Sequence, residues 1–209
     1  PLPPYNYKAP FSPRDVIEEY TRPARMMIDS KIVTKPALSE IEILDILDVG
    51  KLEAFNTDGL RSLLSTMSHI PNMKEKTLRY PGHAELILSK LNQGLFDEDN
   101  IKETAKNLFQ DWKLGKNEKE FTVLDINIYS AEKNIHYHLY DEFNNDTQSS
   151  SMARTTGYTA TATINMLANN LWNEKGVHPP ENIGLEKSCI KFLFKYFNSR
   201  GISIKEKIT

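Results

Sequence analysis

Two segments in which apolar and polar residues alternate, joined by a short turn, limit the possible folds of this chain more than any other part of its sequence. Residues Phe121–Ser130 and Ile135–Phe143 both alternate apolar and polar side chains, and only Ala131–Asn134 separates them. Alternation with a period of two is typical of β-strands, and so short a connection permits only antiparallel pairing. These residues therefore predict a β-hairpin.

Helices and further strands surround that hairpin without a regular strand–helix order. The sequence predicts helices over Pro13–Tyr20, Asp58–Met67, Gly82–Gln93, Ile101–Lys113, Arg154–Lys175 and Glu186–Ser199, and strands over Arg25–Ile28, Lys31–Lys35, Ile41–Ile46, Lys51–Thr57, Lys74–Tyr80 and Ile202–Ile208. Pro1–Pro10 is expected to be extended, and Gly176–Gly184 to be a loop. This mixture predicts an α+β fold, with a mixed, largely antiparallel sheet and helices packed mainly on one face.

Size and composition favour one soluble globular domain over residues 1–209. The chain is 39% hydrophobic and 26% charged, and its net charge of −2 is spread without a basic cluster, which argues against nucleic-acid binding. No apolar run reaches the roughly 20 residues of a membrane span. Cys189 is the only cysteine and no signal peptide is visible, so a cytoplasmic location is expected.

Motifs that bind nucleotides or catalytic metals are absent from the sequence. None of the nine glycines forms Gly-x-Gly, so the chain lacks the dinucleotide fingerprint and no cofactor-binding residue is predicted. No Cys-x-x-Cys, His-Glu-x-x-His or Gly-x-Ser-x-Gly occurs either. The chain also starts at Pro1 rather than Met, and we therefore expect it to be a piece of a longer protein.

Two histidines on one predicted strand raise the question of a metal. His136 and His138 are two residues apart and so share a face of the strand. A metal pair needs this arrangement together with further ligands. Cross-strand packing explains the pair without a metal, and we predict no metal site.

The end of a predicted strand offers groups suited to binding an anionic substrate. In Lys76–His83 the strand ends at Tyr80, Pro81-Gly82 turns the chain, and a helix follows. Arg79 can hold a carboxylate with two hydrogen bonds, and His83 can transfer a proton near neutral pH. The alternative is a surface arginine and a histidine that caps the helix.

Three other segments have a similar layout. Asp58 follows a strand and precedes a helix, where it can bind substrate or simply cap the helix. Arg14 lies in the first turn of a helix, against the dipole preference, and Arg154 lies at the start of the longest predicted helix. Arginines at three element ends would suit a substrate with several carboxylates, and ordinary surface charge is the alternative.

One known family has a similar set of segments in the same order. The segments that carry the resemblance are Phe11–Arg14, Glu53–Leu60, Thr77–Gly82, Thr155–Ala160 and Gly176–Glu181. The similarity is to the C-terminal domain of saccharopine dehydrogenases and the related lysine 6-dehydrogenases, and it spans essentially the whole chain. The opening Leu2-Pro3 resembles the point where these enzymes leave their Rossmann domain.

The resemblance implies an NAD(P)-dependent oxidoreductase that acts on a C–N bond of an amino acid. NAD or NADP would be bound mainly by an N-terminal Rossmann domain that is absent from this chain. The chain by itself would therefore be inactive. The present domain would bind an amino-acid substrate carrying carboxylates and form a homodimer through its sheet. No catalytic base is assigned, and the implied substrate contacts are Arg14, Asp58, Arg79, Tyr80, His83 and Arg154.

Other functions remain open at this stage. The chain could be a non-enzymatic ligand-binding or oligomerisation module derived from such an enzyme. It could also belong to a lysine 6-dehydrogenase or a carboxynorspermidine-type dehydrogenase. A metal-binding protein built on His136 and His138 is a further alternative.

Overall fold

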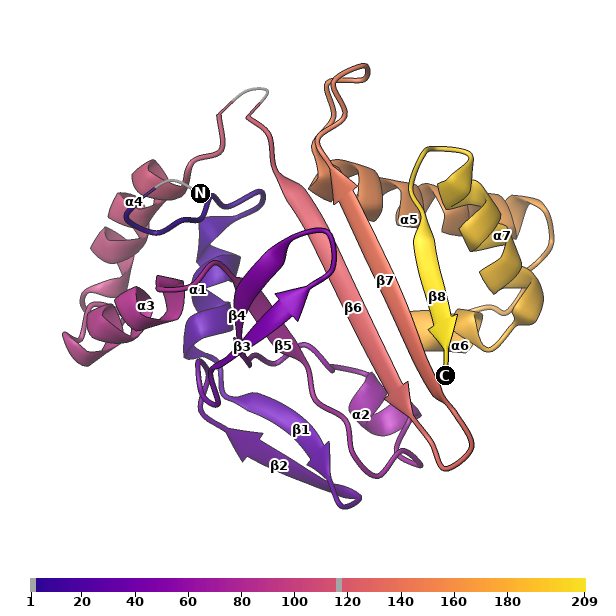
Figure 1. Cartoon of the computed structure of the whole chain (residues 1–209), viewed down its shortest axis with the longest axis horizontal. Coiled ribbons are helices and arrows are strands. Elements are labelled where there is room, and N and C mark those ends of the chain that lie inside the picture. The colour runs from indigo at the N-terminus through magenta and orange to yellow at the C-terminus, as the bar shows by residue number, and fades with distance from the viewer. Residues whose placement is uncertain (1–2, 116–117) are drawn as a thin grey trace. The chain divides into compact units, whose positions relative to one another are not determined.

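A computed structural model describes residues 3–115 and 118–209 of the chain (Figure 1). The chain divides into two compact units, Pro1–Leu114 and Gly115–Thr209, which we call the first and the second unit. Each contains its own strands, helices and hydrophobic core. The two are described separately below.

Over its described residues, the first unit combines two small sheets with four helices. Strands β1 and β2 form a hairpin, and β3, β4 and β5 form an antiparallel sheet in that order. In chain order its elements are α1 (Pro13–Thr21), β1 (Ala24–Ile28), β2 (Lys31–Lys35), β3 (Glu42–Ile46), β4 (Gly50–Asn56), α2 (Leu63–Thr66), β5 (Lys76–Arg79), α3 (His83–Asn92) and α4 (Ile101–Trp112).

The core of the first unit is built on aromatic side chains. Tyr20 from α1, Phe55 from β4 and Trp112 from α4 are almost completely buried. Tyr5, before α1, meets Trp112 edge-on with ring centroids 5.6 Å apart. Such contacts stabilise beyond the buried area alone, by about 0.5–1.5 kcal/mol per pair. They hold α1, α4 and the leading segment together.

The second unit is a three-stranded antiparallel sheet with helices packed on it. The strand order is β6-β7-β8, and α5 contacts both β6 and β7. Leu139 of β7 packs with Phe197 and Ile202, and a second cluster joins α5 to α7 around Met166 and Cys189. Its elements are β6 (Phe121–Tyr129), β7 (Asn134–Glu142), α5 (Ser151–Ala168), α6 (Pro180–Gly184), α7 (Lys187–Asn198) and β8 (Ile204–Ile208).

The α+β class and the antiparallel pairing of the named strands are confirmed. The strands are divided among three small sheets of two, three and three strands, where one larger sheet was expected. The predicted hairpin exists, but its turn lies one residue earlier, because Tyr129 pairs with Asn134. None of the helices in the described part of the chain is both long and apolar enough to cross a membrane.

Several predicted boundaries were wrong for local reasons. Helix α5 starts at Ser151, since the Ser150 hydroxyl accepts a hydrogen bond from the Ala153 amide at 3.1 Å. It ends at Ala168, close to Asn170, whose positive φ of 54° is incompatible with a continuing helix. Helix α2 begins only at Leu63, because Arg61 has φ 49°.

The predictions for the two loop segments also need correction. The expected loop Gly176–Gly184 contains the short helix α6, which begins at Pro180. In Pro1–Pro10, residues 3–6 form turns rather than an extended segment. Pro1 and Leu2 lie outside the described residues. The start of the predicted extended segment and the resemblance at Leu2 therefore fall outside them too.

Candidate functional site

An open cavity of about 370 Å³ in the first unit is rich in carboxylates. Five acidic side chains and two arginines line it, so a positively charged group has more partners there than an anion. The lining residues are Phe11, Asp15, Glu18, Glu19, Arg22, Thr57, Asp58, Gly59, Arg61, Glu75 and Thr77.

Arg79 ends β5 behind this lining and is already paired. Its Nη2 donates to Glu19 Oε2 at 2.8 Å, and its guanidinium lies over the Tyr7 ring, 4.4 Å from the centroid. The side chains of Arg79 and Glu19 are 14% and 29% exposed. Burial raises the pKa of Glu19, and the Arg79 charge opposes that rise. Arg79 therefore positions a carboxylate of the cavity wall in this structure.

His83 is completely buried at the start of α3 and belongs to the same network. Its Nδ1 lies 2.8 Å from the Tyr5 carbonyl oxygen, which can only accept, so Nδ1 carries the proton. Its Nε2 then accepts from the Tyr20 hydroxyl at 2.8 Å. The Tyr20 oxygen is in turn 3.4 Å from Arg79 Nε, a long hydrogen bond. One chain of hydrogen bonds thus joins Arg79 to the core.

The environment of His83 changes the role expected for it. Burial, aided by the nearby Arg79 charge, lowers the pKa of His83 to about 4. The imidazole is therefore neutral at neutral pH and fully engaged by Tyr5 and Tyr20. This arrangement does not favour the expected proton transfer near neutral pH, and it is not the surface cap that was the alternative.

Asp58 lines the cavity but is held from behind by Arg25. Arg25 Nε donates to Asp58 Oδ1 at 2.9 Å and Nη2 donates to Oδ2 at 2.8 Å, a two-pronged pair. These hydrogen bonds lower the pKa of Asp58. Because α2 begins five residues later, Asp58 does not cap it.

Glu75 and two threonines form a polar wall that sequence reasoning did not single out. Thr57 Oγ1 donates to Glu75 Oε2 at 2.5 Å, and the Gly59 amide donates to the same oxygen at 3.1 Å. Thr77 Oγ1 lies 2.8 Å from Thr57 Oγ1. Burial raises the pKa of Glu75 despite these donors. Glu75, like Glu19, is therefore a lining carboxylate whose charged form a bound cation would stabilise.

A buried carboxylate on the neighbouring strand also supports the turn after Arg79. Glu53 Oε2 accepts from the Gly82 amide at 3.0 Å, and Oε1 accepts from the Ala84 amide at 2.5 Å. Glu53 therefore supplies to α3 the cap that its own N-terminal residue, Gly82, lacks. Nothing local in the sequence signals this role, since Glu53 precedes the helix by about thirty residues.

The remaining predicted residues are differently placed. Arg154 belongs to the second unit, where its Nε and Nη2 donate to the Asp141 carboxylate at 3.0–3.3 Å. Both side chains are 5% exposed, and Arg154 Nη2 also donates to the Arg200 carbonyl at 3.1 Å. Arg14 is exposed on α1, and Tyr80 is half-buried after β5.

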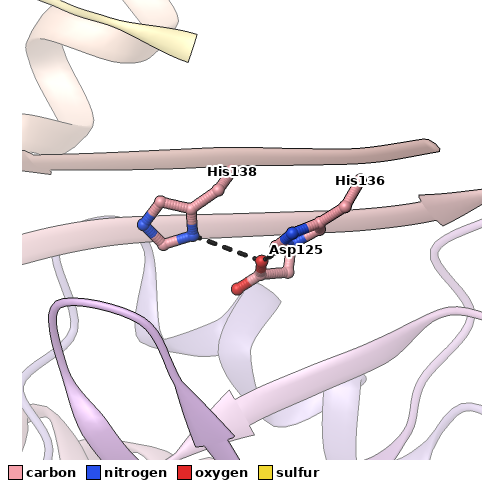
Figure 2. Close-up of side chains that lie close together, drawn as sticks. All are labelled: Asp125, His136 and His138. Carbon is pink, nitrogen blue, oxygen red and sulfur yellow. Dashed lines mark hydrogen bonds and ion pairs between the residues drawn. The ribbon is translucent and has the colours of Figure 1, made fainter. Parts of the chain in front are cut away.

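A separate cluster lies on the β6–β7 hairpin (Figure 2). Asp125 pairs in register with His138, and His136 shares their face of the sheet. Asp125 Oδ1 lies 3.2 Å from His138 Nδ1 and in close hydrogen-bond contact with His136 Nε2. The two histidines are recognisable from their spacing in the sequence, but Asp125 is not, because the predicted turn would have put Asp125 opposite Tyr140.

Comparison with known proteins shows the family. The model for the saccharopine dehydrogenase C-terminal domain matches residues 1–202. The chain belongs to this family. The match spans almost all of both compact units, as the sequence resemblance predicted.

A solved structure shares the fold of this member of the saccharopine dehydrogenase C-terminal domain family. It is apo saccharopine dehydrogenase (L-Glu forming) from Saccharomyces cerevisiae, with a TM-score of 0.74 and 17% sequence identity. The alignment covers 100% of this chain and 65% of that protein, so this chain spans about two thirds of its length. At this identity the likeness shows the fold alone.

Proposed function

We propose that this chain is the substrate-binding and dimerisation domain of a cytoplasmic, NAD(P)-dependent oxidoreductase that acts on a C–N bond of an amino acid. The family match over residues 1–202 is the observation that carries the proposal. Of the six residues implied by the resemblance, Arg14, Asp58 and Tyr80 remain its predicted substrate contacts. The side chains of Arg79, His83 and Arg154 are held by partners inside the protein. The structure adds a cavity that Asp58 lines, together with Glu19, the partner of Arg79.

The cavity lining supports a substrate that carries both amine and carboxylate groups. Glu19 and Glu75 offer carboxylates to an ammonium group, and Arg61 and Arg22 offer guanidinium groups to a carboxylate. Arg79 acts on Glu19 from behind rather than lining the cavity itself. We therefore assign Arg79 the role of a positioning residue.

The described residues do not fit the cofactor itself. The cavity has more carboxylates than arginines and would repel a pyrophosphate, and no Gly-x-Gly sequence occurs. When bound, NAD(P) supplies hydride transfer. We expect a nucleotide-binding domain outside this chain to hold it, and this chain alone to be inactive.

An exposed apolar face of β6 supports subunit pairing through the sheet. Leu124, Ile126 and Ile128 alternate along this edge strand, share one face, and are each 42–48% exposed. Ile208 of β8, paired with Ile135, continues the apolar surface and is 55% exposed. Contiguous exposed apolar residues of this kind are typical of protein interfaces.

A substrate panel on the full-length parent protein tests the proposed activity. Saccharopine, lysine and carboxynorspermidine are each assayed with NAD and with NADP. We expect turnover of one of them, and an increase in KM of about tenfold or more in Glu19→Gln, the loss expected for a charged hydrogen bond. The control Glu103→Gln, on the exposed face of α4, should behave as wild type. No turnover with any combination of substrate and cofactor would favour a non-enzymatic module.

Light scattering on the purified chain tests the pairing. We expect a dimer that Ile126→Lys converts to monomer, while Ile32→Lys, a similarly exposed strand residue of the first unit, leaves it intact. A monomeric wild-type chain would contradict the proposed dimer.

A further inference from the structure

The hairpin cluster of Asp125, His136 and His138 is held by backbone pairing rather than by mobile loops. Asp125 and His138 are direct partners in the β6–β7 ladder, and His136 is two residues away on β7. Residues at these positions project from one face of the sheet, as Figure 2 shows for all three. The ligand atoms therefore converge without a change in backbone conformation.

The spacing of these atoms suits a single small cation. One nitrogen of each histidine and one oxygen of Asp125 all lie within 4.8 Å of one another. A tetrahedral zinc ion with bonds of about 2.0–2.2 Å separates its ligand atoms by about 3.3–3.5 Å. The 3.2 Å between His138 Nδ1 and Asp125 Oδ1 is already close to that spacing.

Exposure of the cluster leaves one side accessible. The His138 and Asp125 side chains are 2% and 15% exposed, whereas His136 is 34% exposed. A cation can enter past His136 and keep a water molecule as its fourth ligand. Asp125 Oδ2 is buried without a hydrogen-bond partner among the described residues, so a cation would also satisfy a polar atom that is costly to bury alone.

The donor set selects the class of metal. Two imidazole nitrogens and one carboxylate oxygen suit Zn²⁺ and similar divalent transition metals, whereas Mg²⁺ and Ca²⁺ prefer an all-oxygen shell. Lys205 and Lys207 of β8 pair in register with His138 and His136, and their positive charges lower the affinity for any cation. We propose that Asp125, His136 and His138 form a binding site for Zn²⁺ or a chemically similar divalent cation in the second unit.

Such a site would act as a clamp on the hairpin. The ligands come from both strands, so the cation links β6 to β7 and binds only the folded state. Preferential binding to the folded state raises stability as the concentration of free metal increases. Without metal, Asp125 accepts hydrogen bonds from both imidazoles, and this internal network is the competing explanation of the cluster.

Calorimetric titration of the chelator-treated full chain with zinc chloride decides between a metal site and a hydrogen-bond network without metal. We expect one Zn²⁺ per chain, a higher melting temperature in excess Zn²⁺, and no saturable binding of Mg²⁺. His136→Gln should weaken Zn²⁺ binding at least about tenfold. The control His69→Gln alters an exposed histidine of the first unit and should leave binding unchanged.

The outcomes that overturn the site are equally definite. No saturable Zn²⁺ binding by wild type would leave the cluster as a hydrogen-bond network. Binding that survives His136→Gln unchanged would place the metal elsewhere, for example at His178 and Glu174, which lie 3.8 Å apart. Because His138 is buried and its loss can impair folding, the test rests on the more exposed His136, and circular dichroism checks that this variant is folded.

Discussion

Two arginines, one in each unit, differ in what surrounds the guanidinium group. Arg154 meets both oxygens of Asp141 and also the Arg200 carbonyl, and the two charged side chains are 5% exposed. Arg79 meets one oxygen of Glu19, the Tyr20 hydroxyl at a long 3.4 Å, and the face of Tyr7. The first environment is closed, and the second reaches a carboxylate that lines a cavity.

The difference separates a structural arginine from one placed to influence a ligand. A closed, hydrogen-bonded ion pair stabilises only as long as both partners remain, because either charge alone is costly to bury. When the carboxylate of an ion pair lines a cavity, its arginine partner can influence the position and charge of that carboxylate toward a bound ligand. Both arginines were expected to contact substrate, and these surroundings favour such a role only for the Arg79 network.

The largest expected effect is on Arg154. Arg154→Met leaves Asp141 buried without its partner, and we expect it to lower the free energy of unfolding by about 3–5 kcal/mol. Urea denaturation of the chain followed by circular dichroism measures this. The double variant Arg154→Met, Asp141→Leu should recover much of the loss, since no lone charge then remains. A change below about 1 kcal/mol in the single variant would mean that Arg154 is not structural.

A smaller effect is expected from the pH dependence of His83. Its pKa is about 4 in the folded chain and 6.5 in the reference state, so between these values the unfolded chain binds the extra proton. Stability should therefore fall as the pH drops from 6.5 towards 4, by on the order of 3 kcal/mol. Denaturation midpoints at several pH values measure the slope, which His83→Gln should flatten and His69→Gln should not. Equal slopes in all three proteins would exclude His83 as the cause.

Arg79 should be less critical for folding than Arg154. Arg79→Met removes a charged hydrogen bond to Glu19, and we expect a loss of about 1.5–3 kcal/mol in the free energy of unfolding. Glu19 also loses the positive charge that opposes the rise in its pKa. The same urea denaturation measures the stability, and a KM for the parent enzyme raised with kcat unchanged would sharpen the distinction from Arg154. A larger loss of stability than in Arg154→Met would reverse the comparison.

The smallest effect is expected at Arg25, whose side chain is 45% exposed although it forms a two-pronged pair with Asp58. Solvent screens such a pair, so Arg25→Met should change the unfolding midpoint less than any variant above. At raised salt concentration, the unfolding midpoints of wild type and Arg25→Met should be almost equal. A change comparable to that of Arg154→Met would show that exposure does not govern these pairs.

Local patterns predicted the elements better than the contacts between them. The hairpin Phe121–Phe143 was recognised, but its turn was placed one residue late. This error shifted the strand register, so the pairing of Asp125 with His138 was not predicted. Arg79 was singled out because it lies near the end of a predicted strand, whereas its partner Glu19 lies sixty residues away on α1. Neither residue carries a local signal of the other.

Residue order alone determined the α+β class, the hairpin, most helix positions and the family, because periodicity, capping residues and ordered segments are local properties of the chain. Tertiary structure decided which carboxylate meets which guanidinium, how the strands divide into three sheets, and that His83 is internal. Those outcomes depend on strand register and on packing between distant segments. A shift of a residue or two in either moves a side chain to a different partner or to the opposite face.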